Sequence, residues 1–411
     1  MGAFKNKSNR YVMISVLFLA WFIGYFDRLA INIAIIPIGK EFSLTAAESG
    51  LILSVFFISY STMQLFGGMF ADKIGAKKVL IACVLAWSVF TGLTGFAVSL
   101  ASLLVIRFLF GIGEGSFSPA SSVAVAENFP RSGRARAKSI LLSSYQLAGI
   151  VGSFGIASLL AMYNWRMAFH ILAFLGIAVS ILLFFFLPDT DKRGKKKDEK
   201  KISFKQLIKI DIVWKVLIVW FGISIVDWGL ASWMPSYLVN SRHLNLINMG
   251  LLAAVPTTCG FLSIIFSGWL LDKWMNGREK YFLIYGSLGT AFFLFLMFHA
   301  QTIPFAIAFW ALCQISFCSV FVTIFAIPLK YLPGNSIGTA TGTINFGGQV
   351  AGIIAPALVG FLVTMFHGSY HVAFWTLVIA ALISALTGLT IKRQPPHPID
   401  AMEINPAPEE I

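Results

Sequence analysis

The chain has 411 residues, of which 57% are hydrophobic and only 12% charged, and its formal net charge is +13. This composition excludes an ordinary water-soluble domain, which carries about 25% charged residues and would here expose too much apolar surface. It also excludes a basic nucleic-acid-binding domain, because the Lys and Arg residues lie in short gaps between apolar runs rather than on a soluble surface. We therefore expect a membrane protein.

Twelve apolar runs are long enough to cross a bilayer, which takes about 20 residues. They predict an all-α membrane protein with twelve transmembrane helices. In chain order, the runs cover 11–38, 46–70, 79–98, 101–126, 139–162, 167–187, 212–239, 248–271, 281–299, 303–328, 337–366 and 370–391.

A basic polar stretch between the sixth and seventh runs divides the chain nearly in half. We expect an N-terminal six-helix bundle over 1–188, a cytoplasmic basic linker over 189–211 and a C-terminal six-helix bundle over 212–391. The Pro-rich polar residues 392–411 predict a disordered cytoplasmic tail.

Lys and Arg are distributed unevenly between the two sides of the membrane. Among the gaps on the side opposite the N-terminus, only Lys40, Arg166 and Arg242 are basic, although the chain has 31 Lys and Arg residues. Cytoplasmic loops carry the excess of basic residues. The pattern predicts a multi-pass protein of the bacterial inner (plasma) membrane with both termini in the cytoplasm.

The two halves repeat one another. The segment 68–75 after the second run is echoed by 268–273 after the eighth, and 146–150 matches 349–353 at a similar offset. Matches in the same order indicate duplication of a six-span unit, and hence two pseudo-symmetric bundles. The first segment resembles the conserved loop of the major facilitator superfamily. This resemblance implies a conformational gating role, rather than substrate contact, for Gly68, Asp72, Lys73, Gly75, Asp272 and Lys273.

Four ionisable residues lie deep in the N-terminal runs: Asp27, Arg28, Arg107 and Glu114. Each costs roughly 2.5–3.5 kcal/mol at the centre of a membrane helix, so we expect them to face the bundle interior and pair. Arg107 and Glu114 are seven residues apart and share one helix face. An ion-pair cluster that only locks helices together is the structural alternative.

A cavity with an arginine and two carboxylates suits a proton-coupled anion carrier. The planar fork of arginine matches a substrate carboxylate. Burial favours the neutral form of a carboxyl group, so it can load a proton, and its neutralisation changes how strongly the arginines attract the substrate.

Tyr25-Phe26-Asp27-Arg28 and the segment 111–115, followed by Pro119, resemble the anion:cation symporters. This family lies within the major facilitators and includes bacterial sugar-acid/proton symporters of the galactonate, glucarate and hexuronate type. The resemblance implies that Arg28 holds the substrate carboxylate, that Asp27 and Glu114 are protonation sites, and that Arg107 partners a carboxylate.

The same resemblance implies polar substrate contacts at Tyr25, Tyr60, Gln146 and Asn345, although the last three could instead make interhelical hydrogen bonds. Asp227 departs from the family, in which sugar-acid carriers tend to have aromatic residues there. It could bind substrate hydroxyls, take a second proton or pair with a cation on the substrate, or it could be a buried structural carboxyl.

The leading hypothesis is a secondary active transporter that carries a small organic anion, such as a sugar acid, by proton-coupled symport and alternating access. An organic anion exchanger, a sodium-coupled carrier and a non-transporting sensor remain open. An organic phosphate exchanger is disfavoured because the seventh run offers Asp227 and no basic residue. A multidrug/proton antiporter is disfavoured because 145–160 lacks a Gly-Pro pair.

The expected partners are the organic anion, protons or sodium ions, and the lipid bilayer, with no nucleic acid. We find no nucleotide-binding Gly loop, metal cluster or catalytic triad. We therefore expect no cofactor, no metal and no enzyme activity. A monomer is expected, because the fold usually works as one.

Overall fold

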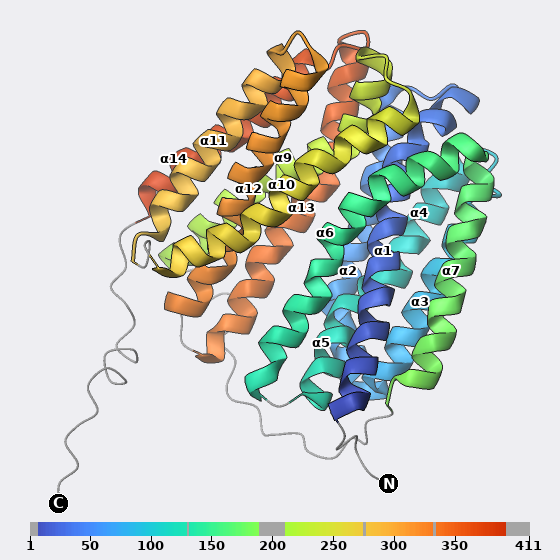
Figure 1. Cartoon of the computed structure of the whole chain (residues 1–411), viewed down its shortest axis with the longest axis vertical. Coiled ribbons are helices and arrows are strands. Elements are labelled where there is room, and N and C mark those ends of the chain that lie inside the picture. The colour runs from blue at the N-terminus through green and yellow to red at the C-terminus, as the bar shows by residue number, and fades with distance from the viewer. Residues whose placement is uncertain (1–6, 130, 189–209, 274–276, 332–333, 392–411) are drawn as a thin grey trace, which may run out of the picture. The chain divides into compact units, whose positions relative to one another are not determined.

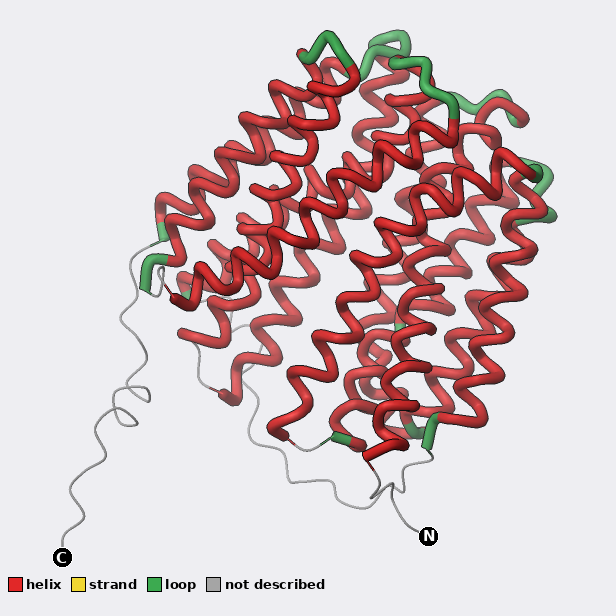
Figure 2. Tube along the Cα trace, viewed as in Figure 1, coloured by secondary structure: helices red, strands yellow, loops and turns green. Residues whose placement is uncertain are grey.

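The computed structural model describes residues 7–129, 131–188, 210–273, 277–331 and 334–391. Within these ranges every regular element is a helix (Figures 1 and 2). The elements are α1 (Lys7–Glu41), α2 (Ala46–Ile74), α3 (Ala76–Thr94), α4 (Leu100–Gly115), α5 (Phe117–Asn128), α6 (Arg131–Met162), α7 (Trp165–Phe186), α9 (Asp211–Ser236), the π-helix η1 (Tyr237–Ser241), α10 (Leu246–Lys273), α11 (Glu279–His299), α12 (Ile303–Tyr331), α13 (Gly334–Met365) and α14 (His371–Thr390).

Twelve spans in the described residues are long and apolar enough to cross a membrane, as the sequence predicts. The fourth combines α4 and α5, and the seventh combines α9 with η1. The predicted all-α membrane fold is therefore confirmed. The predicted tail (392–411) and most of the predicted linker (189–209) lie outside the described residues.

The chain forms two compact units whose boundaries differ from the two sequence halves. Unit 1 comprises Met1–Lys195, Trp228–Thr258 and Gly352–Ala373. Unit 2 comprises Lys196–Asp227, Cys259–Ala351 and Phe374–Ile411. Unit 1 thus contains α1 to α7 together with parts of α9, α10 and α13.

In unit 1, α1 packs against α6 and α7, and α4 packs against α2 and α3. Two glycines of α4 make the second contact close. A Cβ on Gly111 would lie 2.5 Å from the carbonyl oxygen of Phe56, and one on Gly115 would lie 2.7 Å from that of Tyr60. No larger residue fits against backbone at these distances, so the glycines bring the end of α4 directly onto α2.

Unit 1 also joins the beginning of α2 to the last part of α13. The amide of Ala47 donates to Thr364 Oγ1 at 2.8 Å, and the amide of Ala357 donates to Ser54 Oγ at 3.0 Å. A Cβ on Gly50 would lie only 2.5 Å from the carbonyl oxygen of Pro356. Ala47, Gly50 and Ser54 lie three and four residues apart on one face of α2, so the contact runs along the beginning of this helix.

The predicted gating loop contains the turn between α2 and α3. Gly75 ends α2 with φ 97°, a conformation that glycine adopts without strain, and its amide donates to the carbonyl of Ala71 at 3.0 Å. Lys73 and Lys273 occupy the last turns of α2 and α10, where a cation is stabilised by the helix dipole. The side chains of Asp72 and Asp272 lie outside the described residues, as does the environment of Gly68.

Candidate substrate and coupling site

An ion pair between α1 and α4 lies at the centre of the site. Arg28 Nε donates to both carboxylate oxygens of Glu114, at 2.8 and 2.9 Å. The Arg28 and Glu114 side chains are only 13% and 5% exposed. Among the described residues, none accepts a hydrogen bond from the two terminal Nη groups of Arg28. The fork that would hold a substrate carboxylate therefore stays available while Nε holds Glu114.

Three aromatic rings surround the Arg28 guanidinium. Its central carbon lies 4.2 Å from the ring centre of Tyr60, 5.1 Å from that of Phe56 and 5.2 Å from that of Tyr25. The Tyr60 hydroxyl accepts a hydrogen bond from Gln64 Nε2 at 2.9 Å, which holds this ring in place. Such contacts attract a cation and restrict its movement, so Arg28 is both charged and oriented.

Asp27 and Arg107 form the second charged part of the site, and each is 2% exposed. The Asp27 carboxylate accepts a hydrogen bond from the Thr91 hydroxyl through Oδ2, while its Oδ1 has no hydrogen-bond partner. Arg107 Nε is also unpartnered, and its guanidinium lies 4.6 Å from the Phe110 ring centre. Arg107 interacts electrostatically with both Asp27 and Glu114.

The ion-pair partner of Glu114 is not the arginine that shares its helix face. Arg107 and Glu114 do share a helix, but the ion pair of Glu114 is with Arg28 on α1. Gly24 of α1 lies beside this pair, where a Cβ would be 3.4 Å from Glu114 Oε1. Among the described residues, Arg107 makes no direct ion pair. It interacts with the carboxylates of Asp27 and Glu114 electrostatically, without a salt bridge to either.

Unit 2 contains a half-buried carboxyl group in a different setting. Asp227 on α9 interacts with the Gln314 side chain on α12. A Cβ on Gly260 would lie 2.8 Å from Gln314 Cγ, so this glycine of α10 leaves the space that Gln314 fills. Among the described residues, no Lys or Arg forms an ion pair with Asp227.

Further polar groups near Asp227 have no partner. Trp220 Nε1 and Ser224 Oγ, on the same helix, are buried and make no hydrogen bond with any residue that the structure describes. Both face Gly348 of α13, where a Cβ would lie 2.3 Å from Trp220 Nε1 and 3.1 Å from Ser224 Oγ. Gln349 Oε1 is likewise buried without a partner. Unit 2 therefore holds neutral donors and acceptors that a polar ligand could satisfy.

The structure brings six of the predicted site residues together in unit 1. Gln146 is buried on α6 in unit 1, whereas Asn345 is half-buried on α13 in unit 2. Sequence reasoning missed Thr91 and Gln314, because a single hydroxyl or amide in an apolar run carries no signal of its long-range partner. The six residues that unit 1 brings together are Tyr25, Asp27, Arg28, Tyr60, Arg107 and Glu114.

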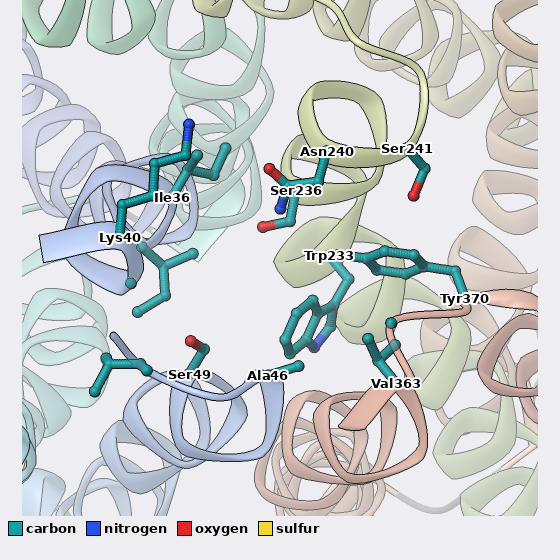
Figure 3. A pocket seen from close by; sticks show the side chains of 14 residues that line it. Ile36, Lys40, Ala46, Ser49, Trp233, Ser236, Asn240, Ser241, Val363 and Tyr370 are labelled. Carbon is teal, nitrogen blue, oxygen red and sulfur yellow. The ribbon is translucent and has the colours of Figure 1, made fainter. Parts of the chain in front are cut away.

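A cavity of about 350 Å³ lies in unit 1 beside the C-terminal end of α1 (Figure 3). Ile36 and Lys40 of α1 form one side of it, and Trp233 and Asn240 form the opposite side. Burial raises the pKa of Tyr370, which also lines it, to about 12, against the opposing effect of a hydrogen bond with Asn240. None of the predicted substrate residues lines this cavity.

Twelve candidate membrane spans among the described residues, with a buried Arg28–Glu114 ion pair in unit 1, define the class as a polytopic membrane protein with charge inside its spans, as in transporters. The solved structure of a bacterial homologue of the human lysosomal transporter Spinster has the same fold. It matches with a TM-score of 0.80 and 19% identity over 94% of this chain and 98% of that one.

The family model described as Major Facilitator Superfamily matches residues 17–356 and 277–403. A Cupriavidus necator protein named "Probable sulfoacetate transporter SauU" is 32% identical, covering 93% of this chain and 94% of its own. The "Hexuronate transporter" of Bacillus subtilis is 28% identical, covering 92% and 94%. The chain belongs to the Major Facilitator Superfamily. The predicted resemblance and the prediction that the chain is not an enzyme are thereby confirmed.

Proposed function

We propose that the chain is a secondary active transporter that moves a small organic anion together with protons by alternating access. The substrate class is a sugar acid or a related acid. The observation that carries this proposal is that Arg28 bonds to Glu114 through Nε alone. Its two Nη groups have no partner among the described residues and can bind a substrate carboxylate.

Protonation of Glu114 supplies the coupling. A neutral Glu114 no longer balances the charge of Arg28, so the arginine attracts an anion more strongly. A bound anion in turn favours the proton on Glu114, because linkage between two ligands is reciprocal. With Asp27 and Arg107 included, the cluster is neutral when both carboxylates are ionised and positive when either is protonated. Asp27, with one oxygen unpartnered, is proposed as a second protonation site.

The names of the relatives support the substrate class, since sulfoacetate and hexuronates are both organic acids. We propose Tyr25, Tyr60, Gln146, Asn345 and Asp227 as further substrate contacts. For Asp227 the proximity of Gln314 favours binding of substrate hydroxyls, because a carboxylate and an amide together offer both acceptors and a donor.

Several assignments follow from the same proposal. The concentration of basic residues in the gaps on the N-terminal side supports the proposal that both termini lie in the cytoplasm of a bacterial cell. The loop that contains Lys73 and Gly75, with its echo at Lys273, takes part in gating. The protein works as a monomer.

Uptake into proteoliposomes tests the proposal. The purified protein would face an acid-outside pH gradient, with a pH dye inside, and the screen would include gluconate, galactonate, glucarate, glucuronate, a dicarboxylate and a sugar phosphate. Substrate-dependent acidification of the interior with an organic acid is the expected result. Uptake that requires sodium instead would replace proton coupling, whereas no uptake of any anion under either gradient would contradict a transport function for organic acids.

A further inference from the structure

A third cation lies in unit 1 beside the proposed site. Lys138 belongs to the membrane span Ala137–Met162 and is only partly exposed. Its Nζ donates to Ser121 Oγ of α5 at 3.2 Å and lies 4.9 Å from the ring centre of Trp21 on α1. Among the described residues, no carboxylate forms an ion pair with it. Lys138 is the second residue of this span, and a partly buried cation there with no counter-ion among the described residues is a candidate for function.

Aromatic rings connect Lys138 to Arg28. Trp21, Tyr25 and Arg28 recur at helical spacing on one face of α1, and the rings of Trp21 and Tyr25 stack with centres 5.3 Å apart. Tyr145 follows Lys138 by seven residues on α6 and packs edge-on against Tyr25 at 4.9 Å. Because α1 and α6 pack together, the two helices present one strip of aromatic rings with a cation at each end.

The charges along this strip do not balance. Arg28 and Arg107 are matched in number by Glu114 and Asp27, whereas Lys138 has no such partner among the described residues. One positive charge therefore remains even when both carboxylates are ionised. The Lys138 ammonium has three donors, and Ser121 uses one of them. Ser121 in turn donates to the carbonyl of Ser118 at 2.8 Å, so its oxygen is fixed as an acceptor.

We infer that the transported substrate is an organic diacid, with one acidic group on the Nη groups of Arg28 and the other on Lys138 Nζ. Its carbon chain lies along the rings of Tyr25 and Trp21. The seven residues from Trp21 to Arg28 rise roughly 10 Å along α1, which suits acidic groups separated by several carbon atoms. This inference rests on the proposed function and specifies its substrate.

Exchange of matched acids across proteoliposomes tests the inference without a proton gradient. Each pair differs by one acidic group: gluconate and glucarate, galactonate and galactarate, and butyrate and succinate. The wild-type protein should exchange at least one diacid with a higher kcat/KM than its monoacid. Lys138→Gln should lower that diacid's kcat/KM by at least about tenfold and leave the monoacid within about threefold, because it removes one charged hydrogen bond. Lys138→Arg should retain the preference.

Lys280→Gln is a matched control, because Lys280 is likewise the second residue of a candidate membrane span and lies 5.3 Å from an aromatic ring, that of Tyr281. It should change neither rate. If Lys138→Gln fails to fold, Ser121→Ala, which removes only the hydroxyl acceptor, should show a smaller loss confined to the diacid. Preference for monoacids, or equal loss of both members of a pair, would overturn the inference and leave the proposed function standing. Exchange of none of the six acids would overturn both.

Discussion

The two compact units treat buried charge differently. Unit 1 holds Arg28 and Glu114 in a direct ion pair at 2.8 Å, beside Asp27 and Arg107. Unit 2 holds Asp227 with an amide partner and no paired cation among its described residues. The sequence repeat predicts similar helices in the two halves, yet the ion pair deep within the spans lies in the first. The two ion pairs of unit 2, Lys215 with Asp211 and Lys330 with Glu279, lie at the ends of its spans. The contrast implies that recognition of the acidic group and coupling depend on unit 1, and that unit 2 contributes neutral polar contacts.

The largest effect is expected from Arg28→Lys. A lysine can still pair with Glu114, but it lacks the planar fork whose Nη groups would hold the substrate. Initial uptake should fall by at least about 100-fold, as for loss of a bidentate charged contact. Arg166→Lys is the control, because Arg166 pairs with Glu41 at 2.7 Å in a partly exposed position. Uptake near the wild-type rate by the Arg28 variant would move recognition away from unit 1.

Glu114→Gln should separate transport from its driving force. The glutamine cannot exchange a proton, so pH-driven accumulation should fall by about tenfold or more. Exchange of labelled for unlabelled substrate should stay within about threefold, because the Nη groups of Arg28 remain in place. Both assays use the same proteoliposomes, which makes the ratio internally controlled. Equal loss in the two assays would mean that Glu114 acts in binding and not in coupling.

The two aspartates test the comparison directly. Asp27→Asn removes the negative charge that acts on Arg107 and should lower the free energy of unfolding by about 3 kcal/mol, as expected for an unpaired buried charge. Asp227→Asn retains an amide that can bond to Gln314 and should cost less than about 1 kcal/mol. Thermal unfolding in detergent measures both. A larger loss for the Asp227 variant would show that unit 2 contains a charge partner of its own.

The smallest effect concerns the contact between α2 and α13 in unit 1. Gly50→Ala places a methyl group against the backbone oxygen of Pro356 and should destabilise the protein by about 1–3 kcal/mol. Gly39→Ala is the matched control, because its nearest neighbour, Ser49 Oγ, lies at an ordinary contact distance of 3.8 Å. The melting temperatures of the two variants should therefore differ. Equal melting temperatures would mean that this contact is loose.

The sequence predicts the twelve spans because each is a long apolar run, and it identifies Asp27, Arg28, Arg107 and Glu114 because charge is rare in such runs. Their pairing could not be predicted. Periodicity places Arg107 and Glu114 on one face, but it contains no information on how α4 meets α1. The position of α4 in the bundle depends on close contacts such as the one between Gly111 and α2, which only the packed structure shows.

Other features are invisible in the sequence for the same reason. Lys138 looks like one more basic residue of a loop, and only the structure shows its contacts with Ser121 and Trp21 at the start of a span. Gln314 is one amide among apolar residues until it meets Asp227. The unit boundaries also differ from the halves of the repeat, because parts of α9, α10 and α13 pack into unit 1.

The central claim is that Glu114 and the substrate act on one arginine, Arg28. Its most direct test is the proton uptake that accompanies substrate binding, measured with a pH indicator in weakly buffered detergent solution above neutral pH. Wild-type protein should take up at least about one proton for each substrate bound, and Glu114→Gln should bind substrate with about one proton fewer than wild type. Undiminished proton uptake in the Glu114→Gln variant would contradict the account and assign coupling to another group.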